Sequence, residues 1–429
     1  RSGDALTTGL SNVAVGDEAL GSETAANRSV AIGVGSLLNQ NVGGGTNAYN
    51  TAIGHAAGNQ ITSGKDNVIV GALAGDAYTI GELNVAVGRS ALSADGVGSR
   101  NTAVGYFSLG NQVAPSGGGA NALYNTAVGY AAGSSVTTGY YNTFLGAEAG
   151  DGTDDGRYNV AIGMRSLSAN TADYNVAVGY RALQDNNGNG QNTAIGGDCL
   201  VSSTSGQNNT GVGVFVLGND DVTGQYNTGI GYAAGFNMSS GSNCTFLGTD
   251  AGRSGSPGGQ HTTGSNSVVI GDENVANIYA QVSLTATSDE RDKTDFTPLN
   301  LGLDFVNDLS PVTYKWDRRI HYADKTEKDW RETVDLDKLS NDGTHKDDDL
   351  QVGFKAQEVI ALEEAAGYKL SDETNLTATQ THDGKQFGLR YERFVPILVK
   401  AIQELSAKVD ALETENTAIK ARLDALEAE

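Results

Sequence analysis

Asn84-Val85-Ala86-Val87-Gly88 is one copy of a phrase that recurs through the first two thirds of the chain. Its general form is Asn, a small or β-branched residue, Ala, Val or Ile, and Gly. Further copies begin at Asn12, Asn50, Asn101, Asn125, Asn159, Asn175, Asn192 and Asn227, and looser copies end at Gly33, Gly71, Gly146, Gly213, Gly248 and Gly271. Nine of the fourteen intervals between successive phrase glycines are 17 residues long, which indicates a repeat architecture.

Within the phrase the side chains alternate as they do along a β-strand. Asn50, Ala52 and Gly54 point to one side, and Thr51 and Ile53 point to the other. Seventeen residues suit one coil of a parallel β-solenoid or β-roll, and such coils must stack because one alone buries too little surface. We expect the small residues to let the backbones approach closely and the branched residues to fill a thin core.

The composition excludes several classes of protein. The 429 residues carry a net charge of −23, and the parts before and after the 287/288 border are both acidic, at 9 − 20 = −11 and 19 − 31 = −12. Nucleic-acid binding needs clustered Lys and Arg, so we expect no nucleic-acid partner. No apolar run is long enough to cross a bilayer, so we expect no membrane insertion. The chain begins at Arg1, and we expect it to be a fragment or a processed form.

Two polar stretches of the repeats match the start of a calcium loop, namely 151–156 and 185–190, but both lack the terminal Glu. Polar turns explain both stretches, with calcium as the alternative. Cys199 and Cys244 have no metal-site spacing, so we expect no metal and no cofactor. Tyr106, Tyr130, Tyr180 and Tyr232 follow a phrase glycine, and we interpret this stripe as packing between coils, with a glycan-stacking face as the alternative.

The repeats stop before Thr287-Ser288-Asp289-Glu290-Arg291-Asp292-Lys293, where the chain becomes charged and helical in pattern. Ser288 and Lys293 have the residue types of a nucleophile and its general base. A serine attacks a carbonyl only if a base takes its proton, and a lysine does so only where its surroundings hold it unprotonated. The alternative is structural: Thr287 with Glu290 three residues later is a capping-box pattern that starts a helix.

Downstream of this border the pattern predicts a small α/β domain over 288–390. Strands are expected at 309–316 and 387–391, a strand leading into a helix at 352–360, and a long exposed loop or hairpin at 317–349. From Glu392 the pattern is helical. An apolar seam with spacings of four and three runs through Leu398, Ile402, Leu405, Val409, Leu412, Asn416, Ile419, Leu423 and Leu426. This seam predicts a coiled coil rather than a helix packed on a globular core.

The repeats over 10–280 resemble the heads of trimeric autotransporter adhesins, in which coils with a similar Asn-x-Ala-[Val/Ile]-Gly phrase stack into left-handed β-rolls on three chains. The resemblance implies a homotrimer. The 17-residue period differs from the shorter period usual in those heads.

Residues 285–429 resemble the intramolecular chaperone auto-processing domain of endosialidase-type phage tailspikes and fibres. The resemblance is carried by Ser288-Asp289-x-Arg291-x-Lys293, Pro311-Val-x-Tyr314-x-Trp316, Gly353-Phe354-x-Ala356-Gln357-Glu358-Val359, and Tyr391 through Leu398, Ala401, Ile402 and Glu404-Leu405. It implies that Ser288 is the nucleophile, that Lys293 is its general base, and that the chain is cut between Thr287 and Ser288. Asp292 stands where an apolar residue is common, and its negative charge would slow the cut by favouring protonated Lys293.

The sequence therefore predicts a mainly β protein: trimeric parallel β-solenoid or β-roll repeats, then a small α/β domain ending in a trimeric coiled coil. The expected domains are a repeat rod (1–280), a linker (281–287), an auto-processing chaperone domain (288–390) and a coiled coil (391–429). The expected function is a homotrimeric phage tail fibre in the virion that binds a host cell-surface glycan or receptor, with no activity beyond single-turnover self-cleavage. The alternatives are a bacterial trimeric surface adhesin and a glycan-degrading tailspike, which would need paired carboxylates in a groove.

Overall fold

The computed structural model describes the chain except for 116–120, 188–189, 219–220, 282–285, 327–329 and 428–429. Parts of the 185–190 stretch and of the expected linker therefore lie outside the described residues. The chain forms two compact units. The first contains Arg1–Ser256 and His261–Asp272, and the second contains Pro257–Gln260 and Glu273–Glu429.

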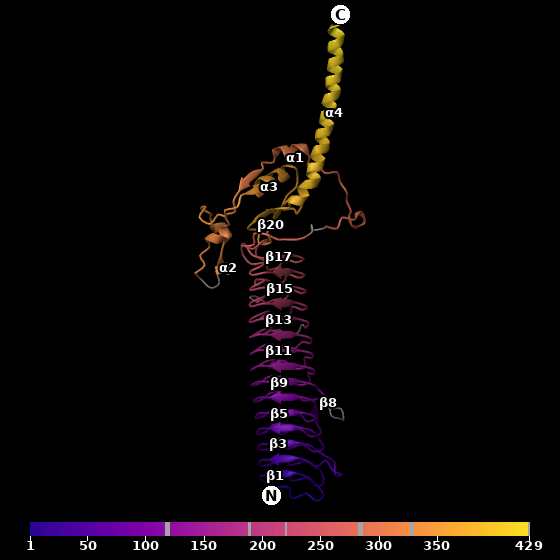
Figure 1. Ribbon diagram of the computed structural model, residues 1–429, viewed down its shortest axis with the longest axis vertical. Coiled ribbons are helices and arrows are strands. Elements are labelled where there is room, and N and C mark those ends of the chain that lie inside the picture. The colour runs from indigo at the N-terminus through magenta and orange to yellow at the C-terminus, as the bar shows by residue number, and fades with distance from the viewer. Residues whose placement is uncertain (116–120, 188–189, 219–220, 282–285, 327–329, 428–429) are drawn as a thin grey trace. The chain divides into compact units, whose positions relative to one another are not determined.

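The first unit is a parallel β-solenoid in which each phrase contributes one three-residue strand (Figure 1). The fifteen strands pair with their neighbours in chain order, and every strand is in register with the next. The strands are β1 (Val13–Val15), β2 (Val30–Ile32), β3 (Thr51–Ile53), β4 (Val68–Val70), β5 (Val85–Val87), β7 (Thr102–Val104), β9 (Thr126–Val128), β10 (Thr143–Leu145), β11 (Val160–Ile162), β12 (Val176–Val178), β13 (Thr193–Ile195), β14 (Thr210–Val212), β15 (Thr228–Ile230), β16 (Thr245–Leu247) and β17 (Val268–Ile270). β6 (Gly98–Ser99) and β8 (Asn121–Ala122) form a separate pair. The prediction of a stacked β-solenoid is confirmed.

The expected direction of the branched residues is wrong. Asn50 and Ala52 are buried, whereas Thr51 is half-buried and Ile53 is exposed. The interior is so thin that only the small middle residue of most strands fits, and the branched residues face outward. The third residue of every strand forms an outward column of Val, Ile or Leu, none of them buried, which we call the aliphatic face: Val15, Ile32, Ile53, Val70, Val87, Val104, Val128, Leu145, Ile162, Val178, Ile195, Val212, Ile230, Leu247 and Ile270.

Two separate physical reasons require glycine at the end of each phrase. Gly54 and Gly196 have φ angles of +139° and +138°, which side-chain-bearing residues rarely adopt. A Cβ on Gly54 would also lie 2.6 Å from the carbonyl oxygen of Gly71 in the next coil, and one on Gly196 would lie 2.1 Å from that of Gly213. The glycines therefore stack directly on one another and set the close approach of successive coils.

The phrase asparagine forms a hydrogen-bonded ladder inside the solenoid. From Asn50 to Asn227, each asparagine side-chain oxygen accepts the backbone N–H of the matching residue in the next coil, at 2.9–3.0 Å; the last of these residues is Cys244. Most of the side-chain amides also donate to a carbonyl 13 to 15 residues further along the chain. These side chains are buried, so each one pairs polar groups that water cannot reach.

Core volume is shared between the strand and a second short phrase that follows it in each coil, such as Ala91-Leu92. Seven of the fifteen coils combine Ala at the middle of the strand with a buried Leu six residues later, as Ala86 does with Leu92. Phe144 occupies the middle of β10, and the Cβ atoms that Gly133 and Gly150 lack would lie 2.8 and 2.3 Å from its ring. A larger residue at one position is thus matched by glycine at the other, as close packing requires.

The stripe of Tyr106, Tyr130, Tyr180 and Tyr232 lies at the surface, with each side chain about half exposed. Tyr106 stacks on Tyr130 in the neighbouring coil, with ring centroids 5.5 Å apart. Contact between coils and exposure to solvent therefore coexist at this stripe.

The second unit is a small α/β assembly with two antiparallel strand pairs, β18–β19 and β20–β21. Its elements are η1 (Glu290–Asp292), α1 (Leu303–Asp308), β18 (Val312–Tyr314), η2 (Arg319–Tyr322), α2 (Trp330–Thr333), η3 (Leu336–Lys338), β19 (Gln351–Gly353), α3 (Ala356–Ala365), β20 (Ala378–Gln380), β21 (Phe387–Leu389), η4 (Tyr391–Arg393) and α4 (Phe394–Glu427). The segment expected as a long loop contains η2, α2 and η3, which bury Ile320 and Leu336. The hydrophobic core of the second unit consists of Leu301, Phe305, Val359, Phe394 and Ile397.

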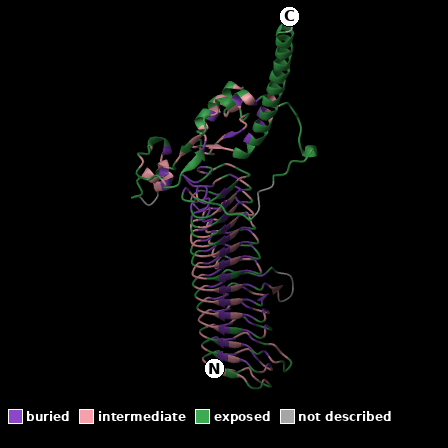
Figure 2. Ribbon diagram, turned by 45° about the horizontal axis from the view of Figure 1, so that its top comes forward, coloured by how far each residue is buried: buried purple, intermediate pink, exposed green. Residues whose placement is uncertain are grey.

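The last helix, α4, is one continuous helix of 34 residues. Its first turns pack into the core of the unit through Phe394, Ile397 and Ala401. Beyond them the expected seam is exposed; Ile402, for example, is 65% accessible, and Figure 2 shows the helix exposed along most of its length. A soluble helix with an apolar seam needs a partner to cover it.

Removing one ladder side chain tests the contribution of the asparagines. We expect Asn142→Ala to destabilise the solenoid by about 3 kcal/mol, because it leaves the buried N–H of Asn159 and the carbonyl of Gly156 unpaired. Thermal unfolding, with hydrogen exchange of the Asn159 amide, measures the effect. The matched control is Asn111→Ala at an exposed turn, and equal melting temperatures for the two variants would contradict the ladder's role.

A half-buried carboxyl makes stability depend on pH. Burial, and secondly the negative charge of Glu148, raises the pKa of Asp151 from its ordinary value to about 6. The folded state therefore binds more protons than the unfolded state between about pH 4 and pH 6, so stability falls as pH rises through that window. We expect Asp151→Asn to stabilise the protein by about 1 kcal/mol at pH 8, after discounting for solvent screening, and by nothing at pH 3.5.

The measurement is thermal unfolding at both pH values, with Asp66→Asn at an exposed turn as the control. A stabilisation by Asp151→Asn that is the same at pH 8 and pH 3.5 would rule out the titration of Asp151 as its cause.

Candidate functional site

The side chains of Ser288 and Lys293 meet, although five residues separate them. The Lys293 Nζ lies 2.5 Å from the Ser288 Oγ and 3.3 Å from the Ser288 carbonyl oxygen. The single 3-10 turn of η1 folds the chain back between them. Nucleophile and base are therefore within the hydrogen-bond reach that proton transfer requires.

The surroundings of this pair are those of a solvated site. Thr287, Ser288 and Lys293 are all exposed in the isolated chain. In this contact the Lys293 Nζ is the hydrogen-bond donor and the Ser288 Oγ is the acceptor. The pair has the spacing of a catalytic dyad, and it lacks the low-dielectric cover that would make Lys293 a base.

Asp289 and Arg291 hold the turn between the two. Asp289 is the N-cap of η1, accepting the backbone N–H of Arg291 at 2.9 Å, and its carboxylate forms an ion pair with the Arg291 guanidinium at 2.6 Å. These contacts lower the pKa of the Asp289 carboxyl. The N-cap is thus Asp289 and not Thr287, and the turn ends after Asp292 without starting a longer helix.

The other motif residues lie on different elements. The Tyr314 ring at the end of β18 meets Trp316 edge-on, with centroids 5.3 Å apart. Gln357 and Glu358 are exposed on the first turn of α3, where Glu358 pairs with Lys355 at 2.7 Å. In the described parts of the chain, no hydrogen bond joins any of these four residues to Ser288 or Lys293.

Two glycines of this unit, Gly353 of the motif and Gly302 outside it, are explained by the side chains that approach them. A Cβ on Gly353 would lie 2.3 Å from the Tyr391 hydroxyl, which accepts the Phe354 N–H at 3.2 Å. A Cβ on Gly302 would lie 2.3 Å from the Glu404 carboxylate, which accepts the Leu303 N–H at 2.7 Å. These contacts tie α4 to the rest of the unit.

Sequence reasoning missed two buried charges of this unit. Glu363 on α3 accepts the backbone N–H and the hydroxyl of Thr377, at 2.6 and 2.7 Å, next to β20. Arg331 forms a buried bidentate ion pair with Glu273, at 2.8 and 3.1 Å. The second pair joins residues on either side of the expected cut. Neither charge lies in a motif that marks it in the sequence.

Neither a metal site nor a membrane span is found among the described residues. No three His, Cys, Asp or Glu side chains converge on a point where a metal ion would fit. No helix among the described residues has the length and apolar character needed to cross a membrane.

Comparison with known families agrees with the geometry. Residues 288–368 match the family model described as chaperone of endosialidase. The C-terminal region contains a domain of this family. The match begins at Ser288, the expected first residue of the released piece, and covers η1 to α3. The prediction of a chaperone-of-endosialidase domain is confirmed, and no curated protein or solved structure matches the chain.

The match to this family also implies autoproteolysis, that is, self-cleavage of the chain. Within the chaperone-of-endosialidase domain, the Ser288–Lys293 pair is where the expected nucleophile and base lie within reach of each other. The β-solenoid before the domain fits a protein of the tail-fibre or tailspike type.

Proposed function

We propose that this protein is a bacteriophage tail fibre whose chaperone-of-endosialidase domain assembles three chains and then cuts itself off between Thr287 and Ser288. The observation that carries the proposal is the contact of Lys293 Nζ with Ser288 Oγ at the first residues of the family match. Ser288 is the nucleophile, and Lys293 is the general base.

In the chemical step the Ser288 Oγ attacks the Thr287 carbonyl carbon, and its proton passes to the Lys293 amine. The bond between that carbon and the Ser288 nitrogen breaks, and the nitrogen takes the proton from Lys293. The product is an ester between Thr287 and the Ser288 oxygen. Water hydrolyses this ester, which frees the Thr287 carboxylate and restores the Ser288 hydroxyl. Each chain is cut once, because the bond is not remade.

Assembly supplies what the isolated chain lacks. In the single chain both Ser288 and Lys293 are exposed to solvent. Cover from neighbouring chains would desolvate the amine and favour its neutral form. This dependence places the cut after assembly, so a chain that has not found its partners keeps its chaperone.

Two exposed apolar surfaces support self-association. The aliphatic face presents a Val, Ile or Leu on each of the fifteen strands, and contiguous apolar surface of this kind marks an interaction site. The seam of α4 is exposed from Ile402 to Leu426, and its alternating spacing of four and three suits a coiled coil. A second and a third copy of the chain cover both surfaces with matching repeats, and Asn416 sets the register of the coiled coil.

There is a kinetic reason for the chains to assemble before the chaperone domain is cut off. Parallel pairing of long repeats is slow and prone to slip by whole coils, because every coil offers nearly the same surface. A C-terminal coiled coil gathers the chains and fixes their register before the solenoids associate. Cutting the chaperone away afterwards removes the route back and gives the fibre kinetic stability.

The assembled fibre belongs to the virion tail and binds a host cell-surface glycan or receptor. A bacterial trimeric surface adhesin is the second candidate, favoured by the repeat phrase alone. A glycan-degrading tailspike is the third, and product release from a bound glycan would distinguish it from a fibre that only binds.

Intact mass spectrometry of the purified protein tests the mechanism. We expect the unaltered chain to give a 287-residue and a 142-residue piece, and Ser288→Ala and Lys293→Met each to give one chain of 429 residues. Light scattering should show that both variants are still trimers, because the clamp and the cut are separate functions.

The matched controls are Ser310→Ala and Lys315→Met, which change exposed residues of the same domain and should leave cleavage intact. Cleavage of Ser288→Ala at the usual rate would contradict the mechanism, and a monomeric Ser288→Ala protein would contradict the assembly role.

A further inference from the structure

A groove opens on the side of the solenoid where three successive coils differ in their turns. Its volume is about 470 Å³, within the range of sites for small molecules. Asp155 and Arg157 come from the lower coil, Asp173 and Tyr174 from the middle one, and Gln191 from the upper one.

A shortened interval between two phrase glycines explains why the groove forms at this place. The interval from Gly163 to Gly179 is 16 residues, and it is the one interval between phrase glycines that is shorter than 17. The missing residue lies in the middle turn: the Asn159 side chain reaches the Ala172 carbonyl 13 residues ahead, whereas Asn142 reaches the Gly156 carbonyl 14 residues ahead. The middle turn is therefore one residue shorter than that of the coil below, which leaves a recess between the lower and upper coils.

One wall of the groove is the end of an aromatic stack. Tyr124, Tyr141, Tyr158 and Tyr174 precede the phrase asparagine in four successive coils, with left-handed φ angles of 55°, 58°, 56° and 61°. Their rings lie nearly parallel, with successive centroids 5.2, 5.2 and 4.8 Å apart. The stack ends at Tyr174, where the next coil has Gln191 in the same position, and Tyr174 is 54% exposed. The Tyr174 ring stacks on Tyr158, and Tyr174 also lines the groove.

The remaining walls carry fixed polar groups. The Arg157 guanidinium donates to the Tyr140 hydroxyl at 3.0 Å and lies over that ring, 5.1 Å from its centroid. Asp173 accepts the Arg157 backbone N–H at 2.8 Å, and the Asp173 carbonyl accepts the Gln191 N–H at 3.2 Å. These bonds hold a guanidinium and a carboxylate beside the aromatic wall before any ligand arrives, which lowers the ordering cost of binding.

We propose that this groove binds a sugar ring of a neutral glycan, stacked on Tyr174 and hydrogen-bonded through its hydroxyls to Asp155, Asp173 and Arg157. An aromatic face beside carboxylates suits a pyranose, which has one apolar face of C–H groups and an edge of hydroxyl donors. Two carboxylates against one guanidinium leave the groove negatively charged, which disfavours sialylated and other acidic sugars. The inference rests on the proposed attachment function and assigns it a site.

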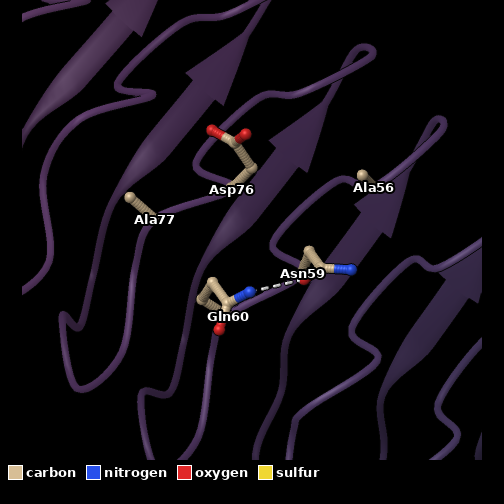
Figure 3. A pocket seen from close by; sticks show the side chains of 5 residues that line it. All are labelled: Ala56, Asn59, Gln60, Asp76 and Ala77. Atoms are coloured by element: carbon tan, nitrogen blue, oxygen red, sulfur yellow. Dashed lines mark hydrogen bonds between the residues drawn. The ribbon is translucent and has the colours of Figure 1, made fainter.

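A second groove of the solenoid shows what is specific to the first. It has a volume of about 380 Å³ and is lined by Ala56, Asn59, Gln60, Asp76 and Ala77 (Figure 3). No aromatic ring borders it, and the Gln60 amide donates to the Asn59 side-chain oxygen at 2.9 Å. It has no surface on which a sugar ring can stack.

The test starts from the full-length protein on an array of neutral and sialylated oligosaccharides, followed by calorimetry with the neutral oligosaccharide that gives the strongest signal. We expect Tyr174→Ala to weaken binding about tenfold, since stacking on the ring is lost. Tyr49→Ala is the matched control, because Tyr49 has the same place in its coil, a φ of 51° and a similar exposure of 48%, but lies outside the groove.

A glycine inserted between Ala172 and Asp173 gives a second, independent test. It restores the 17-residue interval and should fill the recess, so we expect it to abolish binding while Tyr174 is retained and the melting temperature is kept. Unchanged binding in both altered proteins would overturn the site.

The remaining outcomes are also decisive. Binding only to sialylated probes, or to none, would contradict the inference, as would release of shortened sugars, which would make the groove hydrolytic. Failure of the site can be told from failure of the proposed function. If the protein binds a glycan regardless of Tyr174, attachment stands and this groove does not; if Ser288→Ala is still cut while Tyr174→Ala loses binding, the groove stands and the processing mechanism does not.

Discussion

The buried ladder of asparagine side chains is the interaction on which the solenoid depends. Backbone hydrogen bonds join successive coils at the strands and at the turns, and the asparagine side chains add buried bonds to them. Each asparagine adds an acceptor for the next coil and, in most coils, a donor to a turn carbonyl, so the strand and the turn are fixed by one side chain. The phrase glycines then allow the coils to approach until these bonds close at 2.9–3.0 Å. Within the run from Asn50 to Asn227, removing an asparagine side chain would leave buried polar groups unpaired, and adding a side chain at a phrase glycine would make backbones collide.

The dependence on Asn and Gly at fixed positions explains how much of the solenoid could be predicted from the sequence. Hydrogen bonds and glycine conformations depend on the residue type at one position, so the recurring Asn and Gly predicted every strand of the long sheet. The direction of Ile53 was not readable, because alternation gives two faces without saying which one is inside. The interior belongs to the alanines because the second short phrase already fills it with leucine, as the pairing of Ala86 with Leu92 shows. That balance involves residues from different parts of the coil.

In the second unit, contacts between residues close in the sequence could be predicted, and contacts between distant residues could not. The approach of Lys293 to Ser288 is local, and the motif around them indicated it. The contacts of Glu363 with Thr377 and of Glu404 with Leu303 join residues 14 and 101 positions apart, and a single carboxylate carries no signal of such a partner. Three parts of the isolated chain are open to solvent: the aliphatic face, the seam of α4 and the Ser288–Lys293 pair. Self-association would cover the first two, and in our account it also activates the third.

The central claim is that assembly, and not the single chain, makes Lys293 a base. Reactivity of the Lys293 amine towards an acylating reagent, measured by mass spectrometry in Ser288→Ala protein, tests it most directly. The account predicts that acylation of Lys293 sets in at a lower pH in the assembled protein than in a variant kept monomeric by Leu405→Asp and Leu412→Asp, because cover favours the neutral, reactive amine, while exposed Lys315 shows the same pH profile in both. The same pH profile for Lys293 in the monomer and in the assembly would contradict it.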